Sequence, residues 1–202
     1  ISDLYTHPNH PVAFLVTGAE LAQWLERSVS IYRQISLGAK DAELLDPDFP
    51  SFNFEVIFGL TYQINLAMPA RFDMFGQVIN PDASRIENLC FAGRAVVADQ
   101  PFILVSNSFR REGGQGFVGT GSERVIFAGE AHVARLVIDY VSLGGTVPQI
   151  DPQRWRFAQM PHTSVVFDSS PKANQVIDEL PHLGLQPLQT LTSGFQRFRL
   201  QL

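Results

Sequence analysis

The feature of this sequence that most constrains its fold is an apolar run that ends abruptly in a glycine-rich loop. Residues Phe102 to Val105 are four consecutive apolar residues, which is the pattern of a buried strand. Residues 106–117 then carry polar side chains, three glycines in four positions, and phenylalanines at 109 and 117. Glycines allow positive φ and close approach of the backbone to a ligand. The stretch predicts a loop that stacks a flat ring and hydrogen-bonds its edges, or, more simply, a turn-forming loop with two core phenylalanines.

The order of residues in this loop resembles a known nucleotide-binding loop. Asn-x-aromatic, a short polar spacer and Gly-Gly-x-Gly-Phe are similar to the C-terminal domain of the 5′-nucleotidase family. The resemblance implies that Phe109 stacks on the base, that Gly113 and Gly114 permit backbone contact, and that Gln115 and Asn107 address the ribose. The family has an acid where this chain has Gln115, and an amide can still donate to and accept from a hydroxyl.

The first ten residues carry a second resemblance. Asp-Leu-Tyr followed by Pro-Asn is similar to one branch of that family, the bacterial bifunctional 2′,3′-cyclic-nucleotide 2′-phosphodiesterase/3′-nucleotidases. The resemblance implies that Tyr5 is the second aromatic plate opposite Phe109, and that Asn9 contributes to substrate binding. Each stacked face contributes on the order of 1–3 kcal/mol and tolerates different bases, so the base preference stays open.

Residues 51–65 alternate in a way that predicts a hairpin of two strands. Phe52, Phe54, Val56 and Phe58 would share one face, with a turn at Gly59 and a returning strand. Regular alternation of this kind normally indicates core packing. The resemblance adds that Phe52 or Phe54 lines the floor of the pocket, because related enzymes place a base-stacking phenylalanine in the corresponding strand.

Composition excludes several classes of function. A chain of 202 residues with 45% hydrophobic and 17% charged residues is globular and long enough for a substantial core. The net charge of −5 argues against a surface for nucleic-acid polymers, although a nucleotide needs only a few local donors. No apolar stretch approaches the ~20 residues of a membrane span.

The remaining patterns predict an α+β fold, a layered sandwich of mixed β-sheets with flanking helices. A capping box at Thr17 and Glu20 begins a helix predicted to run to about Ile35, and a second helix is predicted over 130–143. We expect residues 1–157 to form a nucleotide-recognition domain whose N-terminal part is missing. Residues 158–202 are expected to form an appended β-α-β subdomain on the same body, with its helix over about 171–180 and an edge strand at its end.

The sequence shows no pattern for chemistry of its own. Phosphate-ester hydrolysis needs a metal-activated water or an activated nucleophile, and no metal-ligand cluster or nucleophile motif is present. The resemblance implies that the parent protein is a metal-dependent phosphoric ester hydrolase of nucleotide catabolism, and that this chain is a fragment of it. Two divalent metals are then expected in an N-terminal metallophosphoesterase domain, and a periplasmic or secreted location follows from the same resemblance.

The sequence therefore predicts a substrate-recognition domain that binds a nucleotide or nucleoside, with no cofactor of its own. Two alternatives stay open. The first is an interaction or scaffold domain that has lost nucleotide binding, with Gln115 as a sign of that loss. The second is a binder of another flat ligand, such as a flavin.

Overall fold

The computed structural model of the chain describes residues 5–112, 116–146, 154–179 and 181–202. Its strands and helices alternate irregularly along the sequence. The strands are β1 (Pro11–Thr17), β2 (Ala42–Glu43), β3 (Leu60–Ile64), β4 (Ile86–Phe91), β5 (Arg94–Ala95), β6 (Pro101–Asn107), β7 (Val125–Ala128), β8 (Trp155–Phe157), β9 (Ser164–Ser169), β10 (Gln186–Thr190) and β11 (Gln196–Gln201). The α-helices are α1 (Gly18–Ser28), α2 (Ser108–Arg111) and α3 (Val133–Ser142), and short 3₁₀ turns occupy Val29–Ile31, Ser51–Asn53, Ser122–Arg124, Pro171–Gln175, Ile177–Glu179 and Pro181–Leu183.

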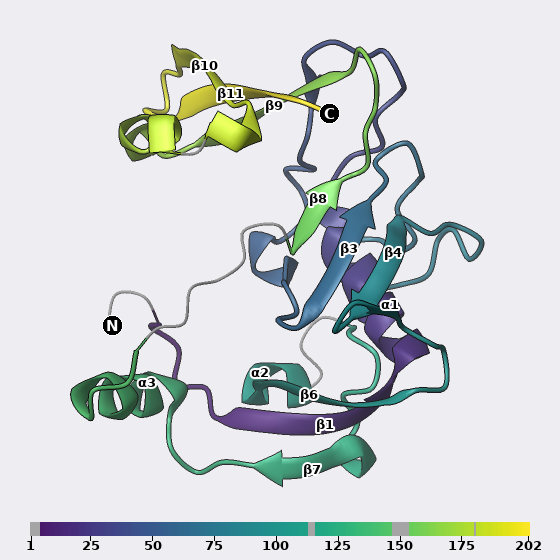
Figure 1. Ribbon diagram of the computed structural model, residues 1–202, viewed down its shortest axis with the longest axis vertical. Coiled ribbons are helices and arrows are strands. Elements are labelled where there is room, and N and C mark those ends of the chain that lie inside the picture. Colours follow the sequence, from purple (N-terminus) through teal and green to yellow (C-terminus); the bar gives the residue numbers. More distant parts are fainter. Residues whose placement is uncertain (1–4, 113–115, 147–153, 180) are drawn as a thin grey trace.

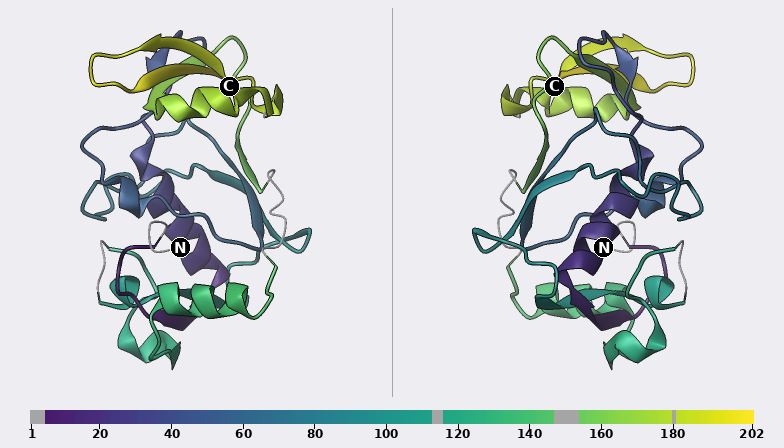
Figure 2. Two further views of the ribbon diagram at one scale, coloured as in Figure 1. Left: turned by 90° about the vertical axis from the view of Figure 1, so that its left-hand side faces the viewer. Right: turned by 90° about the vertical axis from the view of Figure 1, so that its right-hand side faces the viewer.

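The described strands form three sheets that lie in tiers along the long axis of the molecule (Figures 1 and 2). The lowest in Figure 1 has the order β6-β1-β7, the middle one β5-β4-β3-β8 and the uppermost β10-β11-β9-β2. Most neighbours are antiparallel, but β8 pairs with β3 and β2 pairs with β9 in parallel. This arrangement confirms the predicted α+β class with mixed sheets.

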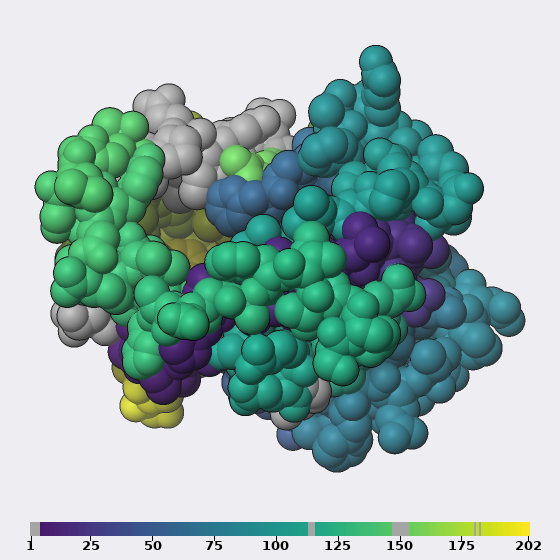
Figure 3. Space-filling model, turned by 90° about the horizontal axis from the view of Figure 1, so that it is seen from below, coloured from purple at the N-terminus to yellow at the C-terminus, as the bar shows by residue number. Residues whose placement is uncertain are grey.

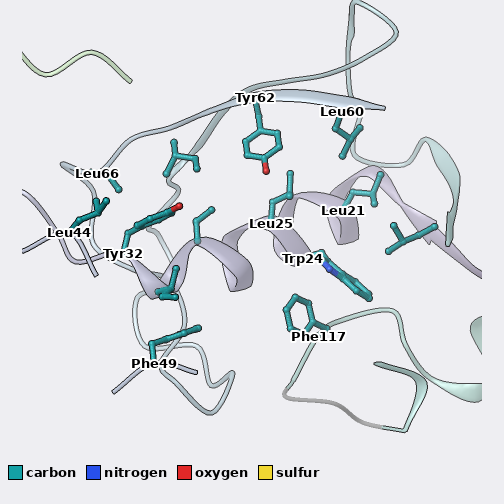
Figure 4. Packing of buried hydrophobic residues seen from close by; sticks show 14 of the residues in the cluster. Leu21, Trp24, Leu25, Tyr32, Leu44, Phe49, Leu60, Tyr62, Leu66 and Phe117 are labelled. Carbon is teal, nitrogen blue, oxygen red and sulfur yellow. The ribbon is translucent and has the colours of Figure 1, made fainter. Parts of the chain in front are cut away.

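Helix α1 carries the centre of the core. The predicted capping box is present, because the Thr17 hydroxyl accepts from the Glu20 amide while the Glu20 carboxylate accepts from the Thr17 amide. Leu21, Trp24 and Leu25 then face the interior at helical spacing, against β3 on one side and the loop after α2 on the other (Figure 4). The α-helix ends at Ser28, earlier than predicted, because one 3₁₀ turn follows and the chain then pairs with residues 44–45.

Two buried charges join α1 to the start of β4. One Glu26 carboxylate oxygen accepts from the amides of Arg85 and Ile86 at 2.7 Å each. The Arg85 guanidinium donates to the carbonyls of Val29, Tyr32 and Met68. Burial raises the pKa of Glu26 and lowers that of Arg85 to about 10, and each opposite charge partly offsets the effect on the other. These side chains satisfy backbone groups between elements where no sheet ladder can do so.

The hairpin predicted for residues 51–65 is wrong in its first half. Residues 51–53 form a 3₁₀ turn, 54–57 are irregular, and only β3 is a strand, with β4 and β8 as its partners. The Ser28 hydroxyl accepts from the Glu55 amide at 2.6 Å and donates to the Glu55 carbonyl at 2.9 Å. These bonds hold the segment on α1 and occupy backbone groups that a strand would need for its ladder.

The C-terminal region differs from the prediction in two respects. The segment predicted as a helix over 171–180 consists of 3₁₀ turns in its described part. The last strand, β11, is not at an edge, because it lies between β9 and β10, and Phe198 is buried at its centre. The fourth strand of this sheet is β2, which comes from outside residues 158–202, and the division of the chain at residue 157 stays a prediction.

None of the helices in the described ranges has the length and apolar character needed to cross a bilayer.

Replacing Gly18 with alanine should destabilise the protein, although glycine to alanine in a helix ordinarily stabilises. A Cβ at Gly18 would lie 2.1 Å from the Val97 carbonyl oxygen and 2.7 Å from a Val96 methyl. We expect a loss of about 1–3 kcal/mol in the free energy of unfolding, measured by urea denaturation. Helix propensity alone predicts a gain of about 0.5–1 kcal/mol. Gln23→Ala on the same helix serves as the control. A Gly18→Ala variant more stable than the parent would refute the close contact.

Ion pairs on the C-terminal sheet should make its stability depend on pH. Hydrogen bonds from Arg199 to Asp41 and from Arg197 to Asp168 hold the pKa of each carboxyl below its ordinary value of 3.8. A carboxyl whose pKa is lowered by folding stabilises the folded state at pH values above its ordinary pKa. This contribution is lost as the pH falls through the folded-state pKa. We therefore compare urea midpoints of the parent and an Asp41→Asn/Asp168→Asn variant. Their difference should be constant above about pH 5 and shrink on acidification; a difference that widens in acid would contradict the assignment.

Candidate ligand-binding site

The end of β6 presents the first aromatic ring of the site. Asn107 caps α2, because its side-chain oxygen accepts from the Arg110 amide at 3.3 Å. This short helix turns the chain so that Phe109 is 40% exposed while the next residue, Arg110, is 2% exposed. Two adjacent side chains therefore divide between the surface and the interior.

Arg110, in α2, joins the end of β6 to residues 52–55, which include part of the 3₁₀ turn Ser51–Asn53. Its Nε lies 2.6 Å from the Glu55 carboxylate. Its two terminal nitrogens donate to the Asn53 side-chain oxygen at 3.1 Å and to the Phe52 carbonyl at 2.9 Å. Its guanidinium also stands 4.1 Å from the Phe117 ring centroid, within cation-π range. One buried side chain thus fixes the position of residues 52–55 relative to Phe109.

Glu55 extends the same network into the core. Its second carboxylate oxygen accepts from the indole N–H of Trp24 at 2.7 Å. Trp24 in turn packs against Phe117, with ring centroids 4.8 Å apart, so the loop after α2 is anchored on α1 (Figure 4). Of the two phenylalanines in the glycine-rich stretch, Phe117 is a core residue and Phe109 is a surface residue.

A cavity of about 390 Å³ opens above this network. Its lining comes from three separate segments of the chain. The lining residues are Tyr5, His7, Pro8 and Asn9, then Phe52 and Glu55, then Asn107, Phe109 and Arg110.

The two exposed phenylalanines of this cavity contact each other. The Phe52 and Phe109 ring centroids are 6.2 Å apart at an interplanar angle of 80°, an edge-to-face contact. On the other wall the Asn9 amide donates to the Tyr5 hydroxyl at 3.4 Å. The cavity therefore combines aromatic rings from three segments with amide and carboxylate groups at its edges.

The structure places the predicted site residues in three groups. It gathers five of them, Tyr5, Asn9, Phe52, Asn107 and Phe109, around this one cavity. Phe54 lies elsewhere: its ring contacts Tyr32 and Trp155 at 5.7 and 5.8 Å, because the segment is not a strand and its side chains do not share one face. Gly113, Gly114 and Gln115 lie outside the described residues.

Sequence reasoning missed Arg110 and Glu55. A charged residue directly after the predicted stacking aromatic reads as solvated, and Glu55 interrupts an apolar alternation. The available signal was the pair itself, because one unlike charge stands in each of the two segments predicted to form the pocket. Within the described residues no three His, Cys, Asp or Glu side chains gather to hold a metal ion, so these residues do not fit a metal centre.

Removing the Arg110 guanidinium should destabilise the site far more than removing its neighbour. Arg110→Met leaves the partly buried Glu55 carboxylate, the Asn53 amide oxygen and the Phe52 carbonyl without that donor. We expect a loss of about 3–5 kcal/mol in the free energy of unfolding. Arg111→Met is the matched control, because Arg111 is exposed and its recorded partner is Glu112 at 3.4 Å, worth at most about 1 kcal/mol. Equal urea midpoints for the two variants would show that Arg110 does not hold the segments together.

Comparison with curated proteins gives relatives that align with all or most of this chain. It is 32% identical over its whole length to the trifunctional nucleotide phosphoesterase protein YfkN of Bacillus subtilis, of which it covers 14%. It is 33% identical, again over its whole length, to the 2′,3′-cyclic-nucleotide 2′-phosphodiesterase/3′-nucleotidase of Yersinia enterocolitica, of which it covers 32%. The chain therefore spans a third or less of the length of these relatives.

Solved structures with the same fold are also found. A putative 5′-nucleotidase from Staphylococcus aureus superimposes with a TM-score of 0.60 at 23% identity, over 77% of this chain and 28% of that one. A 5′-nucleotidase precursor from Thermus thermophilus gives 0.53 at 18% identity, over 79% of this chain and 27% of that one. Identities this low show the fold alone.

The sequence model of the family described as 5′-nucleotidase, C-terminal domain, matches residues 1–120, which include β1, α1, β6 and the cavity described above. The chain belongs to that family.

Proposed function

We propose that this domain recognises the nucleotide substrate of a phosphoric ester hydrolase that acts on 2′,3′-cyclic nucleotides and 3′-nucleotides. The observation that carries the proposal is the convergence of Tyr5, Phe52 and Phe109, with Asn9 and Asn107, on one cavity of about 390 Å³. The first and last of these residues, Tyr5 and Phe109, are more than a hundred positions apart in the sequence. A cavity of this volume is in the range of small-ligand sites.

In this proposal the base contacts the aromatic rings of the cavity. Phe109 offers a face, since the residue is 40% exposed and its ring makes an edge-to-face contact with Phe52. Tyr5 is the proposed second plate, and its hydroxyl is oriented by Asn9. Stacking of this kind is worth about 1–3 kcal/mol per base and accepts any base with a π-face.

The amide groups at the edges of the cavity are proposed to address the sugar and the base edges. The Asn107 side-chain oxygen is engaged in the α2 cap, which leaves its NH₂ group as a donor toward the cavity. Backbone contact at Gly113 and Gly114 and ribose contact at Gln115 belong to the same proposal, although these residues lie outside the described ranges.

Hydrolysis itself is proposed to take place elsewhere in the parent polypeptide. Divalent metals there would activate water and stabilise charge on the phosphate. The described residues of this chain offer no group to hold such ions, and their contribution is to bind and orient the base and to exclude water from one side of it. A periplasmic or secreted location for the parent is part of the proposal and rests on resemblance.

Calorimetric titration with adenosine and 3′-AMP tests the binding role. Loss of one stacking face in Phe109→Ala or Tyr5→Ala should weaken binding by about 1–3 kcal/mol, or roughly 5- to 150-fold. Phe75→Ala is the matched control, because Phe75 is 70% exposed and does not line the cavity, and its affinity should equal that of the parent chain.

Two outcomes would contradict the proposal. Equal affinity of the Phe109→Ala variant and the parent would place the base elsewhere. Absence of saturable binding, both in this chain and in the parent polypeptide, would favour the alternative of an interaction domain that has lost nucleotide binding.

A further inference from the structure

Among the described strands, β6 is at the edge of its sheet, and the phase of its ladder identifies which of its backbone groups do not face β1. Within the described residues it pairs with β1 alone, in antiparallel register from Pro11 opposite Asn107 to Thr17 opposite Pro101. Just beyond the two ends of the ladder, the Ser108 amide donates to the His10 carbonyl and the Gly18 amide donates to the Gln100 carbonyl.

Hydrogen-bonded and non-hydrogen-bonded pairs alternate along an antiparallel ladder. Because Ser108 and Gln100 both belong to hydrogen-bonded pairs, the backbone amides and carbonyls of the even-numbered residues of β6 face β1. The amides and carbonyls of Ile103 and Val105 therefore point away from the sheet. No backbone partner for either amide is recorded among the described residues.

A cavity of about 750 Å³ runs along this free edge. Its lining includes every residue from Phe102 to Asn107 on one side and every residue from Glu55 to Phe58 on the other. Consecutive residues of a strand point to opposite faces of the sheet, so a cavity lined by all of them must follow the edge. Six residues of a strand extend about 20 Å.

The sheet formed by β6, β1 and β7 also carries exposed apolar side chains on its outer face. Ile103 and Val105 are 66% and 68% exposed, and on the same face Leu15 and Phe127 are 43% and 57% exposed. The other face, with Val12 and Phe14, packs into the core. Strands that are apolar on both faces belong inside larger sheets, and a free apolar edge is an aggregation hazard that native proteins cover. Figure 3, the view from below, shows β7 and α3 in green at the surface of this end of the molecule.

We propose that a β-strand from the part of the parent polypeptide outside residues 1–202 pairs with the free edge of β6 and fills this cavity. The relatives are long enough to contain such a strand outside the aligned part, because this chain covers only 14% and 32% of the two described above. The added strand would continue the existing ladder of β6 and β1. The inserted segment is an extended one of about five or six residues with apolar side chains, since Leu21, Trp24 and Leu104 form the inner wall.

The added strand would also complete the candidate ligand site. Tyr5, Glu55 and Asn107 line both this cavity and the smaller one that holds Phe109. A strand seated along β6 forms a wall between the two and limits the ligand to the smaller compartment. The strand proposal does not depend on nucleotide binding, because it rests on the sheet edge.

Residue-resolved amide hydrogen exchange on the parent polypeptide tests this inference. The amides of Phe102 and Leu104 face β1 and serve as internal references. If a strand pairs with the edge, Ile103 and Val105 exchange within about tenfold of those references. A free edge gives exchange at Ile103 and Val105 that is faster by about a hundredfold or more, and that result overturns the proposal.

A proline variant separates strand pairing from simple burial. Val105→Pro removes an outward-facing N–H and leaves the bonds to β1 in place, whereas Val105→Thr keeps the N–H. In the parent polypeptide the proline variant should speed exchange at Ile103 by about tenfold or more while the threonine variant leaves it unchanged. Equal exchange in the two variants overturns the proposal. Protection that rises with protein concentration also overturns it, because the occupant is then a second copy.

Discussion

The contact between Arg110 and Glu55 is the interaction on which the candidate site depends. It places a guanidinium that is almost fully buried against a carboxylate, and the remaining donors of that guanidinium satisfy an amide oxygen and a backbone carbonyl. A buried charge is tolerated only when it is paired and fully hydrogen-bonded, so the two segments cannot separate cheaply. The exposed rings of Phe52 and Phe109 are attached to the two sides of this contact. Their relative position is thus set by a buried ion pair whose two members also line the cavity.

A second pair of buried charges connects segments at the centre of the fold. Glu26 and Arg85 are both buried, and both form hydrogen bonds mainly with backbone groups of other segments. The described sheets have only three or four strands each, and long irregular segments connect them. Side chains with several donors or acceptors take over the role that ladder hydrogen bonds have in a larger sheet. These side-chain hydrogen bonds hold irregular segments in place, and the candidate site is made from such segments.

Much of this arrangement could be predicted from sequence, wherever the signal is local. The capping box located the start of α1, and the apolar run from Phe102 to Val105 located β6. The loop motifs nominated Tyr5, Asn9, Asn107 and Phe109, which the fold brings to one cavity.

The failures are long-range. Phe54 and Phe58 alternate like strand residues, but a hydroxyl on α1 takes the backbone bonds that a strand would need. The position of β11 inside its sheet likewise depends on partners that no local pattern reveals. Arg110 and Glu55 escaped notice for the same reason, because a charged residue shows its burial only once its distant partner is known.

The short strand β2 has a consequence for how the molecule is made. Ala42 and Glu43 pair with Val165 and Val166, contacts between residues about 120 positions apart in the chain. Pairing over that separation must wait until the whole intervening chain has left the ribosome, and the entropy of closing so long a loop is lost before the contact forms. The uppermost sheet therefore forms only after β9 has been synthesised, and until then residues 42–43 lack the strand with which they pair.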